Sequence, residues 1–247
     1  MRSSLRTLAK RTYLDGVARE GLGAGRRHAR ALIRGYGRTN AAVRRRHFAE
    51  TDDPKLHIGS GWVPREGWLN VELHPVRSDV MNMDAAAPFP FDDGTFAYVF
   101  SEHMIEHISY VDGGRMLAEC FRVLRPGGRI RISTPDIGFL VDLYGPGKSQ
   151  LQENYIEYLT SFPDPEAPEP LDTFVINKYV RAWGHQFNYD EPTLRRHFEA
   201  AGFVDVSRFA VGESADPVLA DMENVDRMPE GYLQLETFTL EAVKPPS

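Results

Sequence analysis

Residues 56–61 read Leu-His-Ile-Gly-Ser-Gly, and this stretch predicts the first strand and first loop of an α/β domain. The apolar residues before the glycines are typical of a short strand buried in a sheet. Gly59 and Gly61 lack side chains, which lets the backbone approach a ligand closely. Because ligands of open α/β sheets bind at the carboxyl ends of parallel strands, we expect a ligand at this loop. A Gly-x-Gly loop is more often a plain turn, so this interpretation depends on the residues that follow.

Strands and helices alternate after residue 56, which predicts a mostly parallel sheet with right-handed crossovers. Further strands are expected at 68–73, 80–83, 96–100, 129–133, 203–209 and 233–243. Helices are expected at 102–108, 112–124 and 190–201. The predicted fold class is therefore α/β, a three-layer sandwich with a seven-stranded or reduced sheet whose last strand is antiparallel.

Two segments lie outside this alternation. Residues 1–54 contain short amphipathic pieces interrupted by glycines, and they predict a basic helical extension before a domain that spans 55–247. Residues 137–190 are rich in Tyr, Phe and Leu and contain four prolines between 163 and 170. They predict a helical lid with a long loop, inserted in the domain to bind an acceptor.

Composition and charge exclude some classes of protein. The chain of 247 residues is 42% apolar and 26% charged, which is typical of a globular domain. It has no apolar run near the roughly 18 residues of a membrane helix and no apolar core of a secretory signal. The single cysteine, Cys120, excludes an intrachain disulfide and fits a cytoplasmic location.

The charge is unevenly distributed. Residues 1–50 hold thirteen Lys and Arg against three Asp and Glu, whereas the whole chain has a net charge of −6. Such a basic arm can contact a membrane surface peripherally, dock on an acidic surface of its own or a partner subunit in a homodimer, or remain solvated. Because the body is acidic, no specific nucleic-acid partner is expected.

Motifs between residues 55 and 136 resemble, in order, those of class I S-adenosylmethionine (SAM)-dependent methyltransferases. The segments that carry the resemblance are 56–61, 71–75, 84–96, 101–107 and 119–128. The most specific of them is Arg-Val-Leu-Arg-Pro-Gly-Gly at 122–128, and a weaker likeness continues through 185–243. The chain is similar to a compact branch that often accompanies polysaccharide and glycolipid biosynthesis. The resemblance implies a Rossmann-like fold, SAM as the cofactor and S-adenosylhomocysteine as the product.

The resemblance also implies cofactor-binding roles. Glu72, at the end of the second strand, would bind the ribose hydroxyls, and Asp84, after the third strand, would bind the adenine amino group. The other expected cofactor residues are Gly59, Ser60, Gly61 and Ser101 toward the methionine end, and Leu73 and Ala85 toward the nucleoside.

Three features depart from the family pattern. His57 stands where an acidic residue is common, so the carboxylate that helps to seat the amino group of SAM is absent. Only eleven positions separate Gly61 from Glu72, and Glu72 to Asp84 is equally short. We therefore predict that the two crossover helices are shortened or lost, and that the N-terminal segment covers their place.

Histidines are the candidate catalytic residues, because imidazole is the natural base near neutral pH. His103 and His107 are four residues apart on the helix expected at 102–108, so they would share a face near the cofactor, with Glu102 and Glu106 on a neighbouring face. In the alternative, one histidine packs in the core and the glutamates are solvated. His107 or His185 is predicted to be the base, with packing as the alternative role. Asp136, after a strand, would line the acceptor pocket.

A metal ion is not predicted. Two histidines and a carboxylate can bind a metal, and some sugar methyltransferases depend on Mg²⁺, but Mg²⁺ prefers oxygen ligands. A Mg²⁺ ion is therefore compatible with the resemblance but is not assigned.

The resulting hypothesis is a methyltransferase (EC 2.1.1) that O-methylates a carbohydrate or glycolipid precursor, a small-molecule or oligosaccharide acceptor, with a histidine base. The alternatives are an aromatic or lipid acceptor, a non-catalytic SAM-binding scaffold or sensor, and a nucleic-acid or protein methyltransferase. The last is disfavoured, because Ser-Glu-His-Met at 101–104 replaces the Asn-Pro-Pro-Tyr type of motif that serves amine acceptors.

Overall fold

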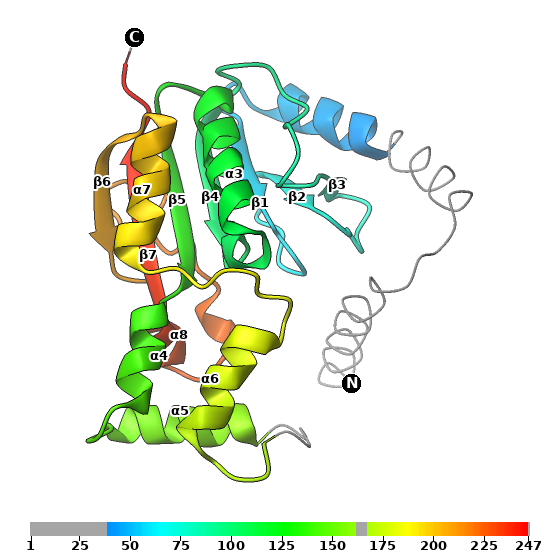
Figure 1. Cartoon of the computed structure of the whole chain (residues 1–247). Coiled ribbons are helices and arrows are strands. Elements are labelled where there is room, and N and C mark those ends of the chain that lie inside the picture. Colours follow the sequence, from blue (N-terminus) through cyan, green and yellow to red (C-terminus); the bar gives the residue numbers. More distant parts are fainter. Residues whose placement is uncertain (1–38, 162–166, 247) are drawn as a thin grey trace.

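A computed structural model describes residues 39–161 and 167–246 of the chain. It contains a seven-stranded sheet with the order β3-β2-β1-β4-β5-β7-β6 (Figure 1). The strands are β1 (Lys55–Ile58), β2 (Leu69–Glu72), β3 (Met81–Asn82), β4 (Phe96–Glu102), β5 (Leu124–Pro135), β6 (Val204–Phe209) and β7 (Thr237–Val243). The first five are parallel, and β7 runs antiparallel between β5 and β6. The predicted Rossmann-like fold with an antiparallel last strand is confirmed.

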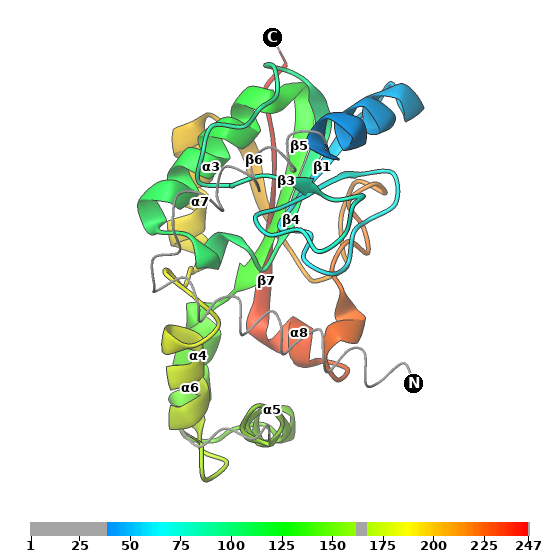
Figure 2. The same cartoon turned by 90° about the vertical axis from the view of Figure 1, so that its right-hand side faces the viewer.

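Helices cover one face of the sheet and a loop covers the other. Helices α3 (Tyr110–Val123) and α7 (Glu191–Ala201) lie side by side on the first face, while the loop at 210–224 lies on the second (Figures 1 and 2). Leu219 and Met222 of this loop pack on Trp68 and Phe100. The ends of α7 follow the prediction, with a proline in its first turn and Gly202 in a left-handed cap.

The crossover helices after β1 and β2 are absent, as predicted, and their place is partly taken by residues 39–50, which form a helix. Val43 and Phe48 of this helix pack against the main core. Asn40 exchanges two hydrogen bonds of 2.9 Å with Asn82 on β3. The helix therefore anchors the edge of the sheet beside the expected cofactor site. The rest of the predicted basic extension, residues 1–38, lies outside the described residues.

The helix predicted at 102–108 is wrong. Strand β4 continues to Glu102, which pairs with Ser133, and the His103 N–H donates to the Ser133 carbonyl oxygen (2.8 Å). His103 then turns the chain with a φ of 46°, and only one 3-10 turn, η1 (Ile105–His107), follows. Sheet pairing has overridden the local helical pattern, so His103 and His107 do not share a helix face.

Two other boundaries differ from the prediction. The strand predicted at 233–243 begins only at Thr237, because the preceding residues form helix α8 (Tyr232–Glu236). Apolar side chains of α8 pack against helices of the segment at 137–190. Strand β5 begins at Leu124, and its pairing with β4 is interrupted between Leu124 and Arg129. The intervening Arg-Pro-Gly-Gly segment thus ends α3 at Val123 and forms a bulge.

Three helices, α4 (Ile137–Tyr144), α5 (Gln150–Thr160) and α6 (Asp172–Arg181), form a separate layer beyond the carboxyl ends of the parallel strands (Figure 1). They share a core of their own with α8. The Tyr155 and Tyr179 hydroxyls, both buried, donate to the Glu236 carboxylate of α8. These contacts attach the inserted segment to β7, which follows α8 directly.

A buried ion cluster joins the sheet to the loop at 210–224. Arg131 of β5 is fully buried and pairs with Glu223 (2.7 Å) and Glu241 of β7 (2.5 Å). Losing one member of such a cluster would leave a buried charge uncompensated, which typically costs about 3–5 kcal/mol. Within the described ranges, the helices are too short or too polar to cross a membrane.

Candidate functional site

The backbone of the glycine loop after β1 lies close to a neighbouring side chain, which is why the loop needs glycine. Gly59 and Gly61 have φ angles of 72° and 50°, in the left-handed region that favours glycine. A Cβ atom at Gly59 would lie 2.4 Å from Cγ of Met104. A side chain at Gly59 is therefore excluded by both backbone conformation and space.

Glu72 connects the end of β2 to this loop. Its Oε2 accepts from the Gly61 N–H (3.0 Å), and its Oε1 accepts from the Leu73 N–H (2.8 Å). Asp84 follows β3 at the same edge of the sheet, is exposed, and accepts from the Ala86 N–H (2.8 Å). Ala85 packs against the main core. These residues line up along the carboxyl edge in the predicted order.

Two buried serines point to a ligand at the same edge. Ser101 pairs with Ile58 across β1 and β4, and its side chain is 1% exposed. Its Oγ and the Oγ of Ser60 are buried without a hydrogen-bond partner in the structure. Because unpaired buried hydroxyls are costly, both are available to a bound polar group.

A cavity opens beside the glycine loop. Its lining consists of His57, Gly59, Ser60, Val63, Arg65, Glu102, His103, Asn224 and Arg227. Four of these, Val63, Arg65, Asn224 and Arg227, are not among the residues that the sequence predicts. Arg65 comes from the short β1–β2 connection and Asn224 from the distant 210–224 loop, so no local motif could identify them. The two arginines make the cavity suitable for an anionic group.

His57 replaces the usual acid with a neutral ring. Its Nδ1 hydrogen bonds with Asn70 Oδ1 (2.8 Å), and Asn70 also accepts from the Arg65 N–H (2.8 Å). Burial, opposed by the Asn70 hydrogen bond and assisted by the nearby charge of Arg65, lowers the pKa of His57 to about 4. The residue is therefore uncharged at neutral pH.

Burial of His57 predicts a loss of stability in acid. An unfolded histidine titrates near 6.5, so the unfolded chain takes up this proton first as the pH falls toward 4. His57→Asn should remove about 1.4 kcal/mol per pH unit of that dependence, measured by chemical denaturation across this window. An unchanged slope in His57→Asn would contradict the assignment.

A second cluster lies just beyond β4. Glu106 of η1 is 1% exposed, so its carboxylate is buried and not solvated. Its Oε2 accepts from the Thr134 hydroxyl of β5 (3.0 Å), whereas its Oε1 has no hydrogen-bond partner. This oxygen lies 3.6 Å from His103 Nδ1 and 3.9 Å from His107 Nε2. The 3-10 turn thus points the carboxylate inward.

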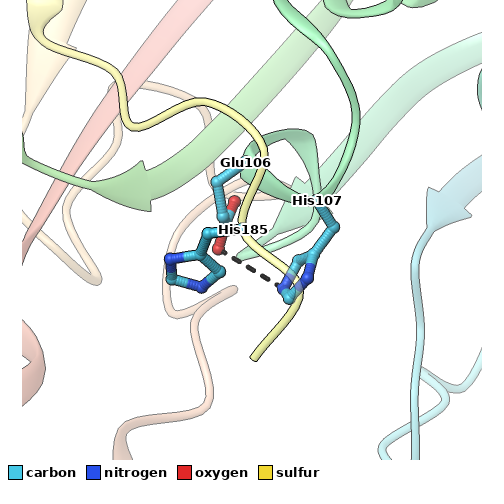
Figure 3. Close-up of side chains that lie close together, drawn as sticks. All are labelled: Glu106, His107 and His185. Carbon is cyan, nitrogen blue, oxygen red and sulfur yellow. Dashed lines mark ion pairs between the residues drawn. The ribbon is translucent and has the colours of Figure 1, made fainter. Parts of the chain in front are cut away.

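His107 and His185 meet in this cluster, although they come from distant segments (Figure 3). Their rings are edge to face, with centroids 4.9 Å apart. The segment that carries His185 is held against η1, because Gln186 donates from its N–H to the Glu106 carbonyl (2.7 Å) and from its side chain to the His107 carbonyl (2.8 Å). His185 Nδ1 hydrogen bonds with the Tyr179 carbonyl (2.9 Å).

Burial controls the charge of this cluster. Burial, together with the nearby ring of His185, lowers the pKa of His107 to about 4. Burial also lowers the pKa of His185 below its usual range. Burial also raises the pKa of Glu106 to about 7. The two imidazoles are therefore neutral near pH 7, with lone pairs that can accept a proton or bind a cation.

The other two predicted catalytic residues have different surroundings. His103 bonds to Thr237 (2.7 Å) and lies 2.9 Å from the guanidinium of Arg227, so its ring nitrogens already have partners. Asp136 caps α4 by accepting from the Gly138 N–H (2.8 Å) and pairs with Arg208 (3.4 Å). Of the four candidates, His107 and His185 thus have the ring nitrogens best placed for chemistry.

Comparison with known proteins gives a family match. Residues 65–132, from the β1–β2 connection into β5, match the model of a family described as a methyltransferase domain. None of the curated proteins matches the chain significantly.

Several solved structures are similar in fold. Phosphoethanolamine N-methyltransferase 2 of Haemonchus contortus, in complex with SAM, is 17% identical, with a TM-score of 0.46 over 79% of this chain and 49% of that one. A SAM-dependent methyltransferase of Archaeoglobus fulgidus is 16% identical, with a TM-score of 0.47 over 85% and 94%. A possible histamine N-methyltransferase of Thermotoga maritima is 16% identical, with a TM-score of 0.45 over 86% and 95%. The chain spans about half the length of the first of these proteins.

Proposed function

We propose that this chain, of which residues 65–132 match a methyltransferase-domain family, transfers the methyl group of SAM to an acceptor hydroxyl. The observation that carries this proposal is the adjacency of two sites. Met104 packs against Gly59 in the glycine loop, and two residues later Glu106 begins the cluster with His107 and His185. A cofactor edge and a pair of neutral bases thus lie side by side.

In the proposed cofactor site, each part of SAM meets suitable chemistry. The Glu72 carboxylate accepts from the ribose hydroxyls, and Asp84 accepts from the adenine amino group. The methionine end enters the cavity beside the glycine loop, where Arg65 is available to its carboxylate. The Ser101 hydroxyl, buried without a partner, borders the same end.

The proposed reaction is an in-line substitution. The acceptor oxygen attacks the methyl carbon, the carbon–sulfur bond breaks, and S-adenosylhomocysteine leaves as the neutral thioether. The hydroxyl proton passes to His107 or His185, whose neutral rings can accept it. Alignment contributes several kcal/mol to such a reaction, and a base contributes about 10²–10⁴-fold.

A carbohydrate or glycolipid precursor is the proposed acceptor, supported by the resemblance to the compact methyltransferase branch. Most aromatic side chains of the inserted segment at 137–190, such as Tyr155 and Tyr179, pack in that segment's own core. Tyr144 is 68% exposed at the end of α4 and can stack on a sugar ring. An aromatic or lipid hydroxyl is the alternative. A non-catalytic SAM-binding role is disfavoured, because it would not need two neutral histidines.

Transfer of a tritiated methyl group from labelled SAM tests the function directly. We expect label on the hydroxyls of sugars or glycolipid precursors in a panel that also contains catechols, lipid alcohols and amines. Label on amines alone would contradict O-methylation. Binding of SAM with no transfer to any acceptor of the panel would favour the scaffold alternative, and no binding of SAM would contradict the whole proposal.

A further inference from the structure

Glu106, His107 and His185 form a group that could hold a metal ion. One ligand atom from each side chain lies within 4.8 Å of the other two. Figure 3 shows the three side chains turned toward one another, from η1 and from the segment after α6. Ligand atoms bound to one tetrahedral metal at about 2.1 Å are about 3.4 Å apart, so small side-chain rotations would close the group around an ion.

Outer hydrogen bonds orient two of the three ligand side chains, His185 and Glu106. His185 Nδ1 pairs with the Tyr179 carbonyl, so it carries the proton and leaves Nε2 with a lone pair. This is the outer hydrogen bond that metal-binding histidines commonly make. Glu106 has the complementary arrangement, because Oε2 accepts from Thr134 while Oε1 is buried and unpartnered. A cation would satisfy this oxygen, whose burial is otherwise costly.

Hydrogen bonds to the backbone hold the two segments of the site together without an ion. Gln186 is 79 residues from His107 in sequence, yet its side chain and N–H bind the carbonyl groups of His107 and Glu106. Trp183 and Gly184, just before His185, both have a positive φ, 59° and 79°. A non-glycine residue in this conformation is strained, and such strain is typical of functional sites.

The donor set selects the class of metal. Two imidazoles and one carboxylate are ligands of zinc and of similar transition metals, whereas Mg²⁺ prefers six oxygens. Arg227, whose charge acts on Glu106, is paired with Glu236 (2.9 Å), which offsets its repulsion of an ion. We propose that Glu106, His107 and His185 bind a divalent transition metal of the zinc type, with at least one coordination position left open.

The role of the ion rests on the proposed function, although its binding does not. An open position next to the cofactor edge would take the acceptor oxygen, and a bound divalent metal lowers the pKa of a coordinated hydroxyl. In the loaded protein, His107 and His185 then hold the metal and the proton leaves to solvent. In the unloaded protein, the same rings are the base.

Metal titration of the untagged full chain tests the binding. After removal of bound metal with a chelator, calorimetry with Zn²⁺ alone should give one site, and Co²⁺ should give the visible absorption of four- or five-coordinate cobalt. Glu106→Gln, His107→Ala and His185→Ala should each weaken Zn²⁺ binding by about 100-fold or more, because even partners that only orient a ligand contribute 10–100-fold. His197→Gln, at a buried histidine of α7 outside the cluster, should bind as the wild type does.

Thermal melts of each variant separate misfolding from ligand loss, and Glu106→Gln keeps the shape of the side chain should the histidine variants fail to fold. Absence of stoichiometric Zn²⁺ binding, or equal binding by wild type and Glu106→Gln, would overturn the metal site. Because SAM and acceptor are not added, this result is independent of methyl transfer. If methyl transfer then persists after chelation, the histidines alone serve the reaction. If the protein binds Zn²⁺ but transfers no methyl group, only the proposed function is contradicted.

Discussion

Glu72→Ala is expected to weaken SAM binding by at least about 100-fold. The proposed carboxylate accepts from both ribose hydroxyls, and a hydrogen bond to a charged group contributes about 1.5–3 kcal/mol. Glu72 also accepts from the Gly61 N–H, so its loss should loosen the glycine loop as well. Calorimetry with SAM and with S-adenosylhomocysteine measures the effect, and both ligands should be weakened equally, because the ribose is common to them.

Two further variants serve as controls for this result. Glu66→Ala removes an exposed carboxylate from the same β1–β2 connection and should bind SAM as the wild type does. Glu72→Gln keeps the shape of the side chain and should bind with intermediate affinity, because an amide still offers one acceptor oxygen. Unchanged affinity in Glu72→Ala would show that the ribose contacts lie elsewhere.

His107→Ala and His185→Ala should each lower kcat by about 10²–10⁴-fold, the usual contribution of a base. The affinity for SAM should change little, because neither side chain lines the cavity beside the glycine loop. Single-turnover transfer from labelled SAM, with calorimetry of the same preparations, separates the two quantities.

The double variant shows whether the two histidines act together. When two residues serve the same step, removing both lowers kcat little more than removing one. The double variant should therefore be nearly as active as the less active single variant. His197→Gln is the matched control and should keep the wild-type kcat. Full turnover in both single variants would make the assignment of the base wrong.

The sequence was sufficient for the sheet but not for the turn after β4. The pattern of apolar runs between glycines and prolines predicted all seven strands, with ends within five residues of those observed. The continuous run of β4 reflects burial on both faces. The glycine loop and Glu72 followed from the same reading, since strand ends align along one edge. The shortness of the two connections also predicted the missing helices correctly.

The candidate catalytic residues could be predicted from the sequence one by one, but not as a cluster. The spacing of His103 and His107 suggested one helix face, yet strand pairing to Glu102 removed that helix. The burial of Glu106 depends on which way a single 3-10 turn points, and residue spacing does not determine this. The contact between His107 and His185 depends on hydrogen bonds between segments far apart in sequence.

The position of β7 has a consequence for how the protein is made. This strand lies between β5 and β6 although it comes after both in the chain, so a ribosome must deliver residues 237–243 before the sheet can close. Until then, Arg131 lacks its partner Glu241, and the apolar edge of β5 stays open to other chains. Non-local pairing of this kind folds slowly and exposes unpaired edges to aggregation. The nascent chain therefore remains vulnerable until residues 237–243 have left the ribosome, and a chaperone that shields β5 before then should raise the yield more than one that acts later.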